Sequence, residues 1–327
     1  MPTLSSIPRQ KKPGLIPSMS GPQIVKPAVN FMIPGFSKCG TTTLCSLLSQ
    51  HPDIFIPEIK EPNFFIRRDY NSRWQIYSSL FADVGGATVL GEGSTFYTGT
   101  NSEVRSREAI VEHYPDIRLI FIARDPIDRL ESSFREYHHS GSKFGLVPPY
   151  DIEEALKVYP NLTADTLYWS RFNNYRRFVP AEHIHLLFLE DLKVQPEVEL
   201  KRCFEFLGVD AGVKIHDDTL QLNRGTSKLY DTRLYRFIRT TAPFGPRLAK
   251  ISIQDKDAIA RPLRLRRPFT RPIKWTQSAF TWLLDKFGDE MHAYLDYAGK
   301  PHDYWPRLAG IEKSLGKVDA SSGADDL

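Results

Sequence analysis

The sequence predicts an α/β fold, a single domain in which a central parallel sheet is flanked by helices. Three short apolar runs, at 29–33, 119–123 and 183–189, indicate strands. Each run is followed by a polar turn and then by a segment of helical periodicity. Because the carboxyl ends of parallel strands meet at one edge of a sheet, we expect ligands to bind at that edge.

Each unit of this pattern follows from its own residues. The first run passes through Pro34-Gly35 and a Ser/Gly/Thr-rich loop into leucines at helical spacing. The second run breaks at Arg124-Asp125-Pro126 before a helix. The third precedes a helix that ends at Gly208, a residue suited to a C-terminal cap. A final helix is predicted near 278–297, where apolar residues again recur at helical spacing.

The ends of the chain differ in composition from its middle. Residues 1–28 are rich in proline and have no apolar signal-peptide core, so we expect a disordered arm. The main domain is predicted at 29–310 and a flexible tail at 311–327. The stretch Arg261 to Lys274 has six basic residues and no acidic one. It predicts a surface loop that would steer an anionic sugar chain or make peripheral contact with a membrane.

Composition excludes several classes of protein. The 327 residues carry a formal net charge of only +4, and no recognition motif is present, so nucleic acid is not an expected partner. No run approaches the roughly 18 apolar residues of a membrane span. Cys39, Cys45 and Cys203 form neither a disulfide framework nor a zinc-ligand pattern. We therefore expect a cytoplasmic protein without a metal, and the oligomeric state stays open.

A glycine-rich loop follows the first predicted strand. Gly35 and Gly40 have the spacing of a Walker A loop, whose amides and following helix bind phosphate. However, Thr41 stands where nucleotide kinases place lysine, and Lys38 lies two residues before the second glycine. A lysine inside the loop suits a nucleotide neutralised by side chains and amides. The alternative is a Gly/Thr-rich turn that binds nothing.

A second motif follows the second predicted strand. Arg124 offers a planar fork for a phosphate, and Ser132, eight residues on, adds a hydroxyl donor. Alone, such an Arg-Asp-Pro turn would be read as a helix cap. Its occurrence about 85 residues after the glycine-rich loop makes the pair more informative than either motif.

In this order the two motifs resemble the phosphate-binding segments of sulfotransferases that use 3′-phosphoadenosine 5′-phosphosulfate (PAPS). The likeness extends from about Phe31 to Trp305. The segments at 60–65 (KEPNFF) and 91–95 (GEGST) are similar to segments of heparan- and chondroitin-type carbohydrate sulfotransferases and of bacterial members. Asn223-Arg224-Gly225 occupies the place of the family's late nucleotide loop. The resemblance implies a P-loop-like core with a nucleotide site formed by Lys38, Cys39, Gly40, Thr41, Thr42, Thr43, Arg124, Ser132, Arg224 and Gly225.

The same resemblance implies the catalytic groups. Sulfuryl transfer to a hydroxyl needs a base for the acceptor proton and positive charge at the leaving oxygen. Glu61 takes the first role by likeness to the carbohydrate enzymes, and Lys38 takes the second. The alternative for Glu61 is a solvated surface carboxylate. Histidine serves as base in cytosolic sulfotransferases, so His138 and His139 are substitute bases ranked below Glu61. The predicted acceptor-binding residues are Lys60, Glu92 and Ser94.

These residues predict an enzyme that transfers a sulfuryl group from PAPS, as co-substrate and without a metal, to a hydroxyl of a carbohydrate or glycoconjugate. Sulfation of a small-molecule or lipid alcohol or phenol by the same chemistry is the alternative. A P-loop kinase is disfavoured because Thr41 replaces the Walker lysine. A non-catalytic binder is disfavoured because it would not require both Lys38 and Glu61.

Overall fold

A sheet of five parallel strands organises the molecule, in the order β2-β3-β1-β4-β5. The computed structural model describes residues 26–215, 228–241 and 253–316. The strands of this sheet are β1 (Val29–Gly35), β2 (Ile54–Phe55), β3 (Val89–Gly93), β4 (Arg118–Ala123) and β5 (Ile184–Phe188). The predicted α/β class with a central parallel sheet is therefore confirmed.

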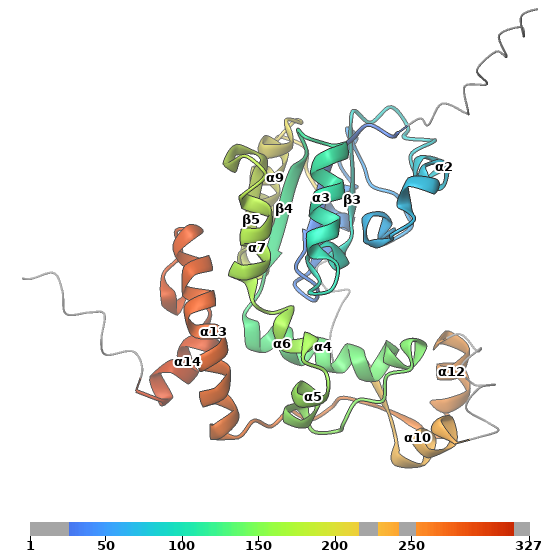
Figure 1. Ribbon diagram of the computed structural model, residues 1–327, viewed down its shortest axis with the longest axis vertical. Coiled ribbons are helices and arrows are strands. Elements are labelled where there is room, and N and C mark those ends of the chain that lie inside the picture. The colour runs from blue at the N-terminus through green and yellow to red at the C-terminus, as the bar shows by residue number, and fades with distance from the viewer. Residues whose placement is uncertain (1–25, 216–227, 242–252, 317–327) are drawn as a thin grey trace, which may run out of the picture.

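Helices cover both faces of the sheet and its carboxyl edge (Figure 1). On the viewer's side lie α3 (Glu103–His113) and α7 (Tyr168–Arg176), and α9 (Pro196–Leu207) lies behind. Across the carboxyl ends of the strands runs α4 (Pro126–Ser140). The other α-helices are α1 (Thr41–Leu48), α2 (Trp74–Ser79), α5 (Ile152–Val158), α6 (Asn161–Ala164), α8 (Leu189–Val194), α10 (Arg233–Thr240), α12 (Ile253–Ala260), α13 (Gln277–Tyr297) and α14 (Pro306–Ser314). The 3-10 helices are η1 (Phe64–Ile66), η2 (Tyr70–Ser72), η3 (Thr95–Thr98), η4 (Gly141–Phe144), η5 (Ala181–His183) and η8 (His302–Tyr304).

The central strands are apolar because both of their faces are covered. Phe31, Met32 and Ile33 of β1 are fully buried, as are the residues Leu119 to Ala123 of β4. Such continuous apolar runs are typical of parallel sheets. For this reason two of the three runs correspond to β1 and β4, while the third corresponds to the edge strand β5, in which Leu187 and Phe188 are buried.

Two strands lie outside those runs. Only two residues form β2, and β3 contains two glycines and a glutamate. Gly91 lies against the ring of Phe31, and a Cβ at this position would come within 2.2 Å of Phe31 Cε1. A glycine is therefore needed where β3 passes the aromatic residue of β1, and at this position it takes the place of a β-branched or aromatic residue that would mark a strand.

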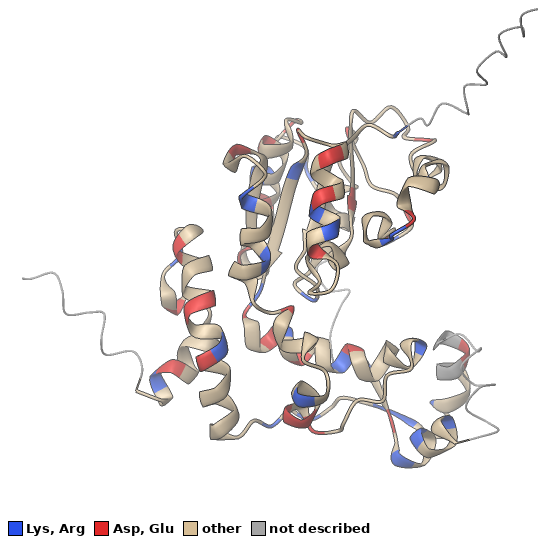
Figure 2. Cartoon of the chain, in the orientation of Figure 1, with Lys and Arg blue, Asp and Glu red and all other residues tan. Residues whose placement is uncertain are grey.

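A second, two-stranded sheet lies below α4. Here β6 (Leu229–Asp231) pairs antiparallel with β7 (Arg266–Pro268). The prediction that Arg261 to Lys274 is a plain surface loop is therefore wrong at its centre, where Arg266 faces inward and pairs with Asp231. Figure 2 shows lysines and arginines gathered on this ribbon and on the adjacent α10.

The C-terminal helices return to the sheet. The final predicted helix corresponds to α13, whose apolar side buries Leu283, Phe287 and Met291. Helix α14 continues to Ser314 and so passes the predicted boundary at 310. The greater part of the predicted arm (1–25) and tail (317–327) lies outside the described residues. Within the described part of the chain, no helix is both long and apolar enough to cross a membrane.

Candidate active site

The glycine-rich loop joins β1 to α1 at the carboxyl edge of the sheet. Gly35 packs against Thr98, whose Oγ1 would lie 2.3 Å from an added Cβ. Gly40, at φ +99°, precedes α1 in a left-handed conformation that favours glycine. Lys38 is also left-handed, at φ +68°. The loop thus turns sharply into the amino end of α1, where Thr41, Thr42 and Thr43 form the first turn.

Buried side chains hold this loop from beneath. The guanidinium of Arg129 on α4 donates to the carbonyl of Ser37 at 3.1 Å, to that of Leu162 at 2.8 Å and to Thr166 Oγ1 at 2.7 Å. Cys39 Sγ lies 3.2 Å from the hydroxyl of Tyr168, and burial raises the pKa of its thiol to about 11. The Cys39 side chain is therefore part of the support of the loop, and only its backbone faces a ligand.

The second motif joins the same support. The hydroxyl of Tyr168 donates to the carbonyl of Arg124 at 2.8 Å, which fixes the end of β4 beside the loop. Asp125 accepts from the amides of Ile127 and Asp128, so it caps α4, with Pro126 in the first turn. The helix-cap interpretation of Arg-Asp-Pro is thus correct for the aspartate. It leaves the arginine available.

Arg124 has spare hydrogen-bonding capacity. Its Nη2 lies 3.2 Å from Asp128 Oδ2, while its buried Nε has no partner among the described residues. Asp128 also accepts from Arg307 Nη1 at 2.6 Å, so one carboxylate orients two guanidinium groups. Ser132 follows Asp128 by four residues on α4 and therefore shares its face. An unpartnered buried donor beside a charged fork fits a phosphate ligand.

Lys38 reaches across to α4. Its Nζ lies 2.9 Å from Glu136 Oε2, and Lys228 pairs with the same oxygen. Burial alone would raise the pKa of Glu136, but the charges of Lys38 and Lys228 hold it well below its usual range. Burial and the charge of Lys38 lower the pKa of Lys228 to about 8. Two ammonium groups therefore meet at one carboxylate next to the glycine-rich loop.

Glu61 lies in a tight segment near α1. Glu61 and Asn63 adopt left-handed backbone conformations, at φ +54° and φ +51°. Such conformations cost free energy in non-glycine residues and need support from their surroundings. Glu61 Oε1 accepts from Thr95 Oγ1 at 3.2 Å. Thr95 and Ser37 line one small cavity of about 40 Å³, which places the Glu61 segment beside the glycine-rich loop.

Glu92 and Ser94 anchor that segment from below. Glu92 is fully buried and accepts from Ser94 Oγ at 2.5 Å, from the hydroxyl of Tyr97 at 2.6 Å and from that of Tyr77 at 3.2 Å. Burial raises the pKa of Glu92 to about 7 against the effect of these three hydrogen bonds. Ser94 Oγ in turn accepts from the amide of Asn63 at 3.0 Å. Glu92 and Ser94 therefore contact the Glu61 segment from within the protein, whereas Lys60 is exposed.

The two histidines of α4 are engaged elsewhere. His138 is buried, its Nε2 lies 3.0 Å from the carbonyl of Pro149, and burial together with nearby arginines lowers its pKa to about 4. His139 Nδ1 accepts from the amide of Leu229 at 3.3 Å. Both contacts belong to the junction of α4 with its neighbours.

The predicted residues Arg224 and Gly225 lie outside the described part of the chain.

Comparison with known proteins gives the family. Residues 29–229, more than half of the chain, match the family described as the sulfotransferase domain. The chain belongs to the sulfotransferase family. It is similar to human heparan sulfate glucosamine 3-O-sulfotransferase 6, with 27% identity over 215 residues covering 63% of this chain and 59% of that protein. It is also 25% identical over 179 residues to human carbohydrate sulfotransferase 15, covering 42% and 32% of the two chains. The sulfotransferase thus spans about three fifths or less of these relatives.

A solved bacterial structure matches as well. The crystal structure of a sulfotransferase from Alicyclobacillus acidocaldarius is 26% identical, covers 58% of this chain and 87% of its own, and superposes with a TM-score of 0.46. Members of this family use PAPS as sulfuryl donor. In the described residues of this sulfotransferase, no group of histidine, cysteine, aspartate and glutamate side chains has metal-ligating geometry.

Three residues at the candidate site of the sulfotransferase were not among those predicted from its sequence. Arg129 contacts the glycine-rich loop, Glu136 contacts its lysine and Lys228 contacts Glu136, across separations of 92 to 98 residues. For Glu136, helical spacing gives one signal, since it follows Ser132 by four residues on the same face of α4.

Proposed function

We propose that this sulfotransferase moves the sulfuryl group of PAPS to a hydroxyl of a carbohydrate or glycoconjugate acceptor. The observation that carries the proposal is that Ser37 of the glycine-rich loop and Thr95, which donates to Glu61 Oε1, line one small cavity, so the loop and the Glu61 segment are neighbours. The carbohydrate acceptor is supported by the two human relatives, whose names specify heparan sulfate and carbohydrate.

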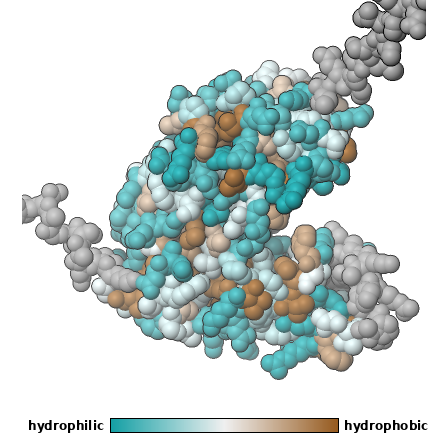
Figure 3. Space-filling view, viewed as in Figure 1, coloured by the Kyte–Doolittle hydropathy of each residue, from teal (hydrophilic) through white to brown (hydrophobic). Residues whose placement is uncertain are grey.

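The donor is expected to lie along the carboxyl edge of the sheet. Loop amides and the amino end of α1 would bind the 5′-phosphosulfate, with support from Thr41, Thr42 and Thr43. Arg124, through its unpartnered Nε, and Ser132 would bind the 3′-phosphate. Lys38 and Lys228 supply positive charge near the loop. Figure 3 shows the surface hollowed between the part of the molecule that holds the sheet and the part that holds α10 and α12, which gives an acceptor a path of approach.

These groups can supply the proton acceptor and the positive charge that the sulfuryl-transfer step needs. The acceptor oxygen forms a bond to sulfur while the bond from sulfur to the bridging phosphate oxygen breaks. Glu61 takes the proton of the acceptor hydroxyl, and Lys38 neutralises the charge that develops on the leaving oxygen. Lys38 contacts Glu136 in the structure, so it must turn from Glu136 towards the donor for this step. Lys60, exposed beside Glu61, would contact the acceptor.

Binding of the product nucleotide tests the site. Calorimetry with 3′-phosphoadenosine 5′-phosphate (PAP) in the presence of EDTA should show micromolar or tighter affinity, because side chains supply the countercharge. Arg124→Ala should weaken this affinity, and Lys38→Ala should lower turnover by about 10²- to 10³-fold. A requirement for magnesium, or stabilisation by ATP rather than PAP, would instead support the kinase alternative.

The chemical class of the acceptor is tested by following a radioactive label from the donor to the acceptor. PAPS labelled with ³⁵S should transfer its sulfuryl group to oligosaccharides in a panel that also contains lipid alcohols and phenols. Transfer to the phenols or lipids alone would overturn the carbohydrate assignment and leave the chemistry intact.

We also propose a reducing compartment, which is supported by the three free cysteines, two of them fully buried.

A further inference from the structure

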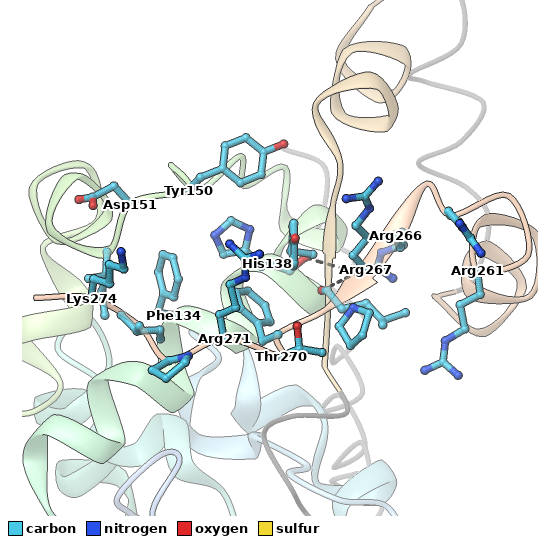
Figure 4. A pocket seen from close by; sticks show the side chains of 18 residues that line it. Phe134, His138, Tyr150, Asp151, Arg261, Arg266, Arg267, Thr270, Arg271 and Lys274 are labelled. Carbon is cyan, nitrogen blue, oxygen red and sulfur yellow. Dashed lines mark hydrogen bonds between the residues drawn. The ribbon is translucent and has the colours of Figure 1, made fainter.

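A large cavity lies below α4, away from the glycine-rich loop. Its volume is about 1280 Å³, and its walls come from the C-terminal half of α4, the start of α5, the β6–β7 ribbon and residues 261–274 (Figure 4). The residues 261–274 lie beyond the part of the chain that matches the family, which ends at 229. The cavity thus joins residues inside and outside the match, and none of the groups assigned above to the transfer step lines it.

The rim of the cavity is strongly basic. Arg261, Arg264, Arg267, Arg271 and Lys274 line it, and all five are exposed. Among the described residues none of these five side chains has an ion-pair partner. The one acidic lining residue is Asp151, and its carboxylate accepts from the amides of Glu153 and Glu154 as the cap of α5. Figure 4 shows the basic side chains spread along the cavity from Lys274 at one end to Arg261 at the other.

The floor is aromatic. Phe269 lies 5.0 Å from Tyr230, 5.5 Å from His138 and 6.0 Å from Phe134, measured between ring centroids. The low pKa of His138 keeps this ring neutral at ordinary pH. Cations above a floor of rings suit a ligand that has anionic groups and apolar ring faces.

The wall that carries the cations is fixed in place. Arg266 is buried, pairs with Asp231 at 3.0 Å and donates to the carbonyls of His139 at 2.8 Å and Leu229 at 3.2 Å. Asp231 also pairs with Arg239 at 2.9 Å. These bonds tie the ribbon to the C-terminal end of α4, so the rim does not depend on a free loop.

The cavity and the glycine-rich loop use opposite faces of α4. Phe134 and His138 line the cavity, whereas Glu136, midway between them, contacts Lys38. At 3.6 residues per turn, positions two apart point about 200° away from each other. A ligand in the cavity is therefore separated from the reacting groups by about the width of a helix, roughly 10–12 Å.

We propose that this cavity is a second anion-binding site that holds acidic groups of the acceptor chain, away from the hydroxyl being sulfated. The ligand class is an acidic glycan with carboxylate or sulfate groups, which arginine binds in bidentate fashion. A concave site with a ring-lined floor fits an extended chain of sugar rings better than the flat surface of a membrane. The link to catalysis rests on the proposed function, but binding at the site does not require turnover.

The test uses matched triple variants of the full chain. The first is Arg267→Ser/Arg271→Ser/Lys274→Ser in the cavity. The control is Arg177→Ser/Lys193→Ser/Lys214→Ser, which removes the same charge from exposed residues elsewhere. Calorimetry would use a heparin octasaccharide, with a neutral dextran oligosaccharide of equal length. If each exposed charge contributes about three- to five-fold in affinity, the loss of three charges should weaken binding of the heparin probe about 30- to 125-fold in the cavity variant. The affinity of the control variant for the heparin probe should stay within about three-fold of wild type. Calorimetry with the neutral dextran should show no difference between the two variants and wild type.

Kinetics provide the second measurement. The cavity variant should raise KM for a long acidic acceptor by a similar factor, leave kcat unchanged and leave KM for a disaccharide acceptor unchanged. Equal losses in both triple variants would overturn the proposal in favour of general charge attraction. Loss of binding to phosphatidylserine vesicles or single-stranded RNA, with heparin binding intact, would overturn it in favour of those partners.

Two controls separate the possible failures. PAP affinity in the cavity variant should equal that of wild type, which shows that the fold and donor site survive. If the triple variant does not fold, Arg271→Ser alone should still weaken heparin binding about three- to five-fold. If heparin binds at the cavity but no acceptor is sulfated, the proposed function fails while the second site stands. If an acidic acceptor is sulfated with unaltered KM in the variant, the second site fails alone.

Discussion

The carboxylate of Glu136 binds two ammonium groups, and this contact decides how the loop responds to pH. Lys228 has its pKa lowered to about 8 by burial and by the charge of Lys38. Glu136, with its pKa held low by the two lysines, stays charged at any pH near neutrality. Lys228 is therefore the group of this cluster that titrates close to physiological pH.

Affinity for PAP should fall as pH rises through about 8, because Lys228 then loses its charge. Conversely, binding of the anion should favour protonated Lys228, so proton uptake should accompany binding near pH 8. Calorimetry in buffers of different ionisation enthalpy measures this uptake. Lys228→Arg should retain affinity at about pH 7 and remove the dependence, since a guanidinium stays charged. Persistence of the same dependence in Lys228→Arg would assign it to another group.

Glu61→Gln tests the base. Glutamine keeps the side-chain shape and can still accept from Thr95, but it cannot take the acceptor proton. Turnover should fall by about 10²- to 10⁴-fold with PAP affinity unchanged. His138→Ala provides the comparison: it should lower stability, because it removes a buried ring, and should leave turnover per folded molecule unchanged. Normal turnover in the Glu61→Gln variant, together with an inactive His138→Ala variant, would replace the carbohydrate-type mechanism with the histidine type.

The sequence predicts roles for the loop lysine Lys38 and for Arg124, because both predictions depend on local spacing after a strand. Glu136 and Arg129 could not be identified in this way, since they act through contacts with residues more than about 90 positions away. Glu92 shows the opposite case. The sequence contains its motif, but only the fold shows that the side chain of Glu92 is buried beneath the Glu61 segment.

Among the secondary-structure elements, the short helix η1 begins where a hydrogen bond joins the chain to the end of β3. The amide of Asn63, which precedes η1, donates to Ser94 Oγ just after β3. The same hydroxyl donates to Glu92. Neither β3 nor this contact follows from hydrophobic periodicity, because the strand is rich in glycine and its position is determined by packing against β1. By contrast β1 and β4 are buried on both faces, and the sequence shows them as apolar runs.

Ser94→Ala should loosen the Glu61 segment without touching the donor site. The loss of one hydrogen bond of about 1 kcal/mol corresponds to a fall in turnover of about 5- to 10-fold, with PAP affinity unchanged. Ser94→Thr, which keeps the hydroxyl, is the comparison for any effect on packing. If alanine leaves kcat at the wild-type value, the anchor does not position Glu61.

Arg129 links α4 to the glycine-rich loop, and its removal should destabilise the fold. Arg129→Met removes the guanidinium donor from the carbonyls of Ser37 and Leu162, of which the second keeps the Thr166 hydroxyl, and from Thr166 Oγ1. We expect a loss of about 2–5 kcal/mol in the free energy of unfolding, measured by urea titration. The exposed Arg177→Met should change it by less than about 0.5 kcal/mol. Equal values for the two variants would contradict the supporting role of Arg129.

At the scale of the whole molecule, the C-terminal segment packs back against the core and places aromatic residues beneath the glycine-rich loop. Tyr294 of α13 lies 5.8 Å from Phe36 between ring centroids and packs with Trp305. The ring of Phe36 stacks on that of Tyr168 at 4.5 Å. The family match ends at residue 229, yet residues far beyond it pack against the loop that the match contains.

Tyr294→Phe should stabilise the protein or leave it unchanged. The hydroxyl of Tyr294 is buried and has no hydrogen-bond partner among the described residues, so its removal should gain up to about 1–2 kcal/mol. Tyr294→Ala should cost about 3–5 kcal/mol through the cavity left below the loop. Thermal and urea unfolding measure both. A Phe variant that loses as much as the Ala variant would show that the hydroxyl has a partner after all.

Helix α4 spans 15 residues and carries the donor-side contacts on one face and the basic cavity on the other. If one acceptor chain is bound at both faces of α4, the thickness of this helix sets the distance between the two binding points. The new sulfate would then be added at a set distance from groups that are already acidic, so the modification pattern along the polymer would be periodic rather than random. Each product would also present fresh anionic groups to the cavity, which would draw the chain forward for the next transfer.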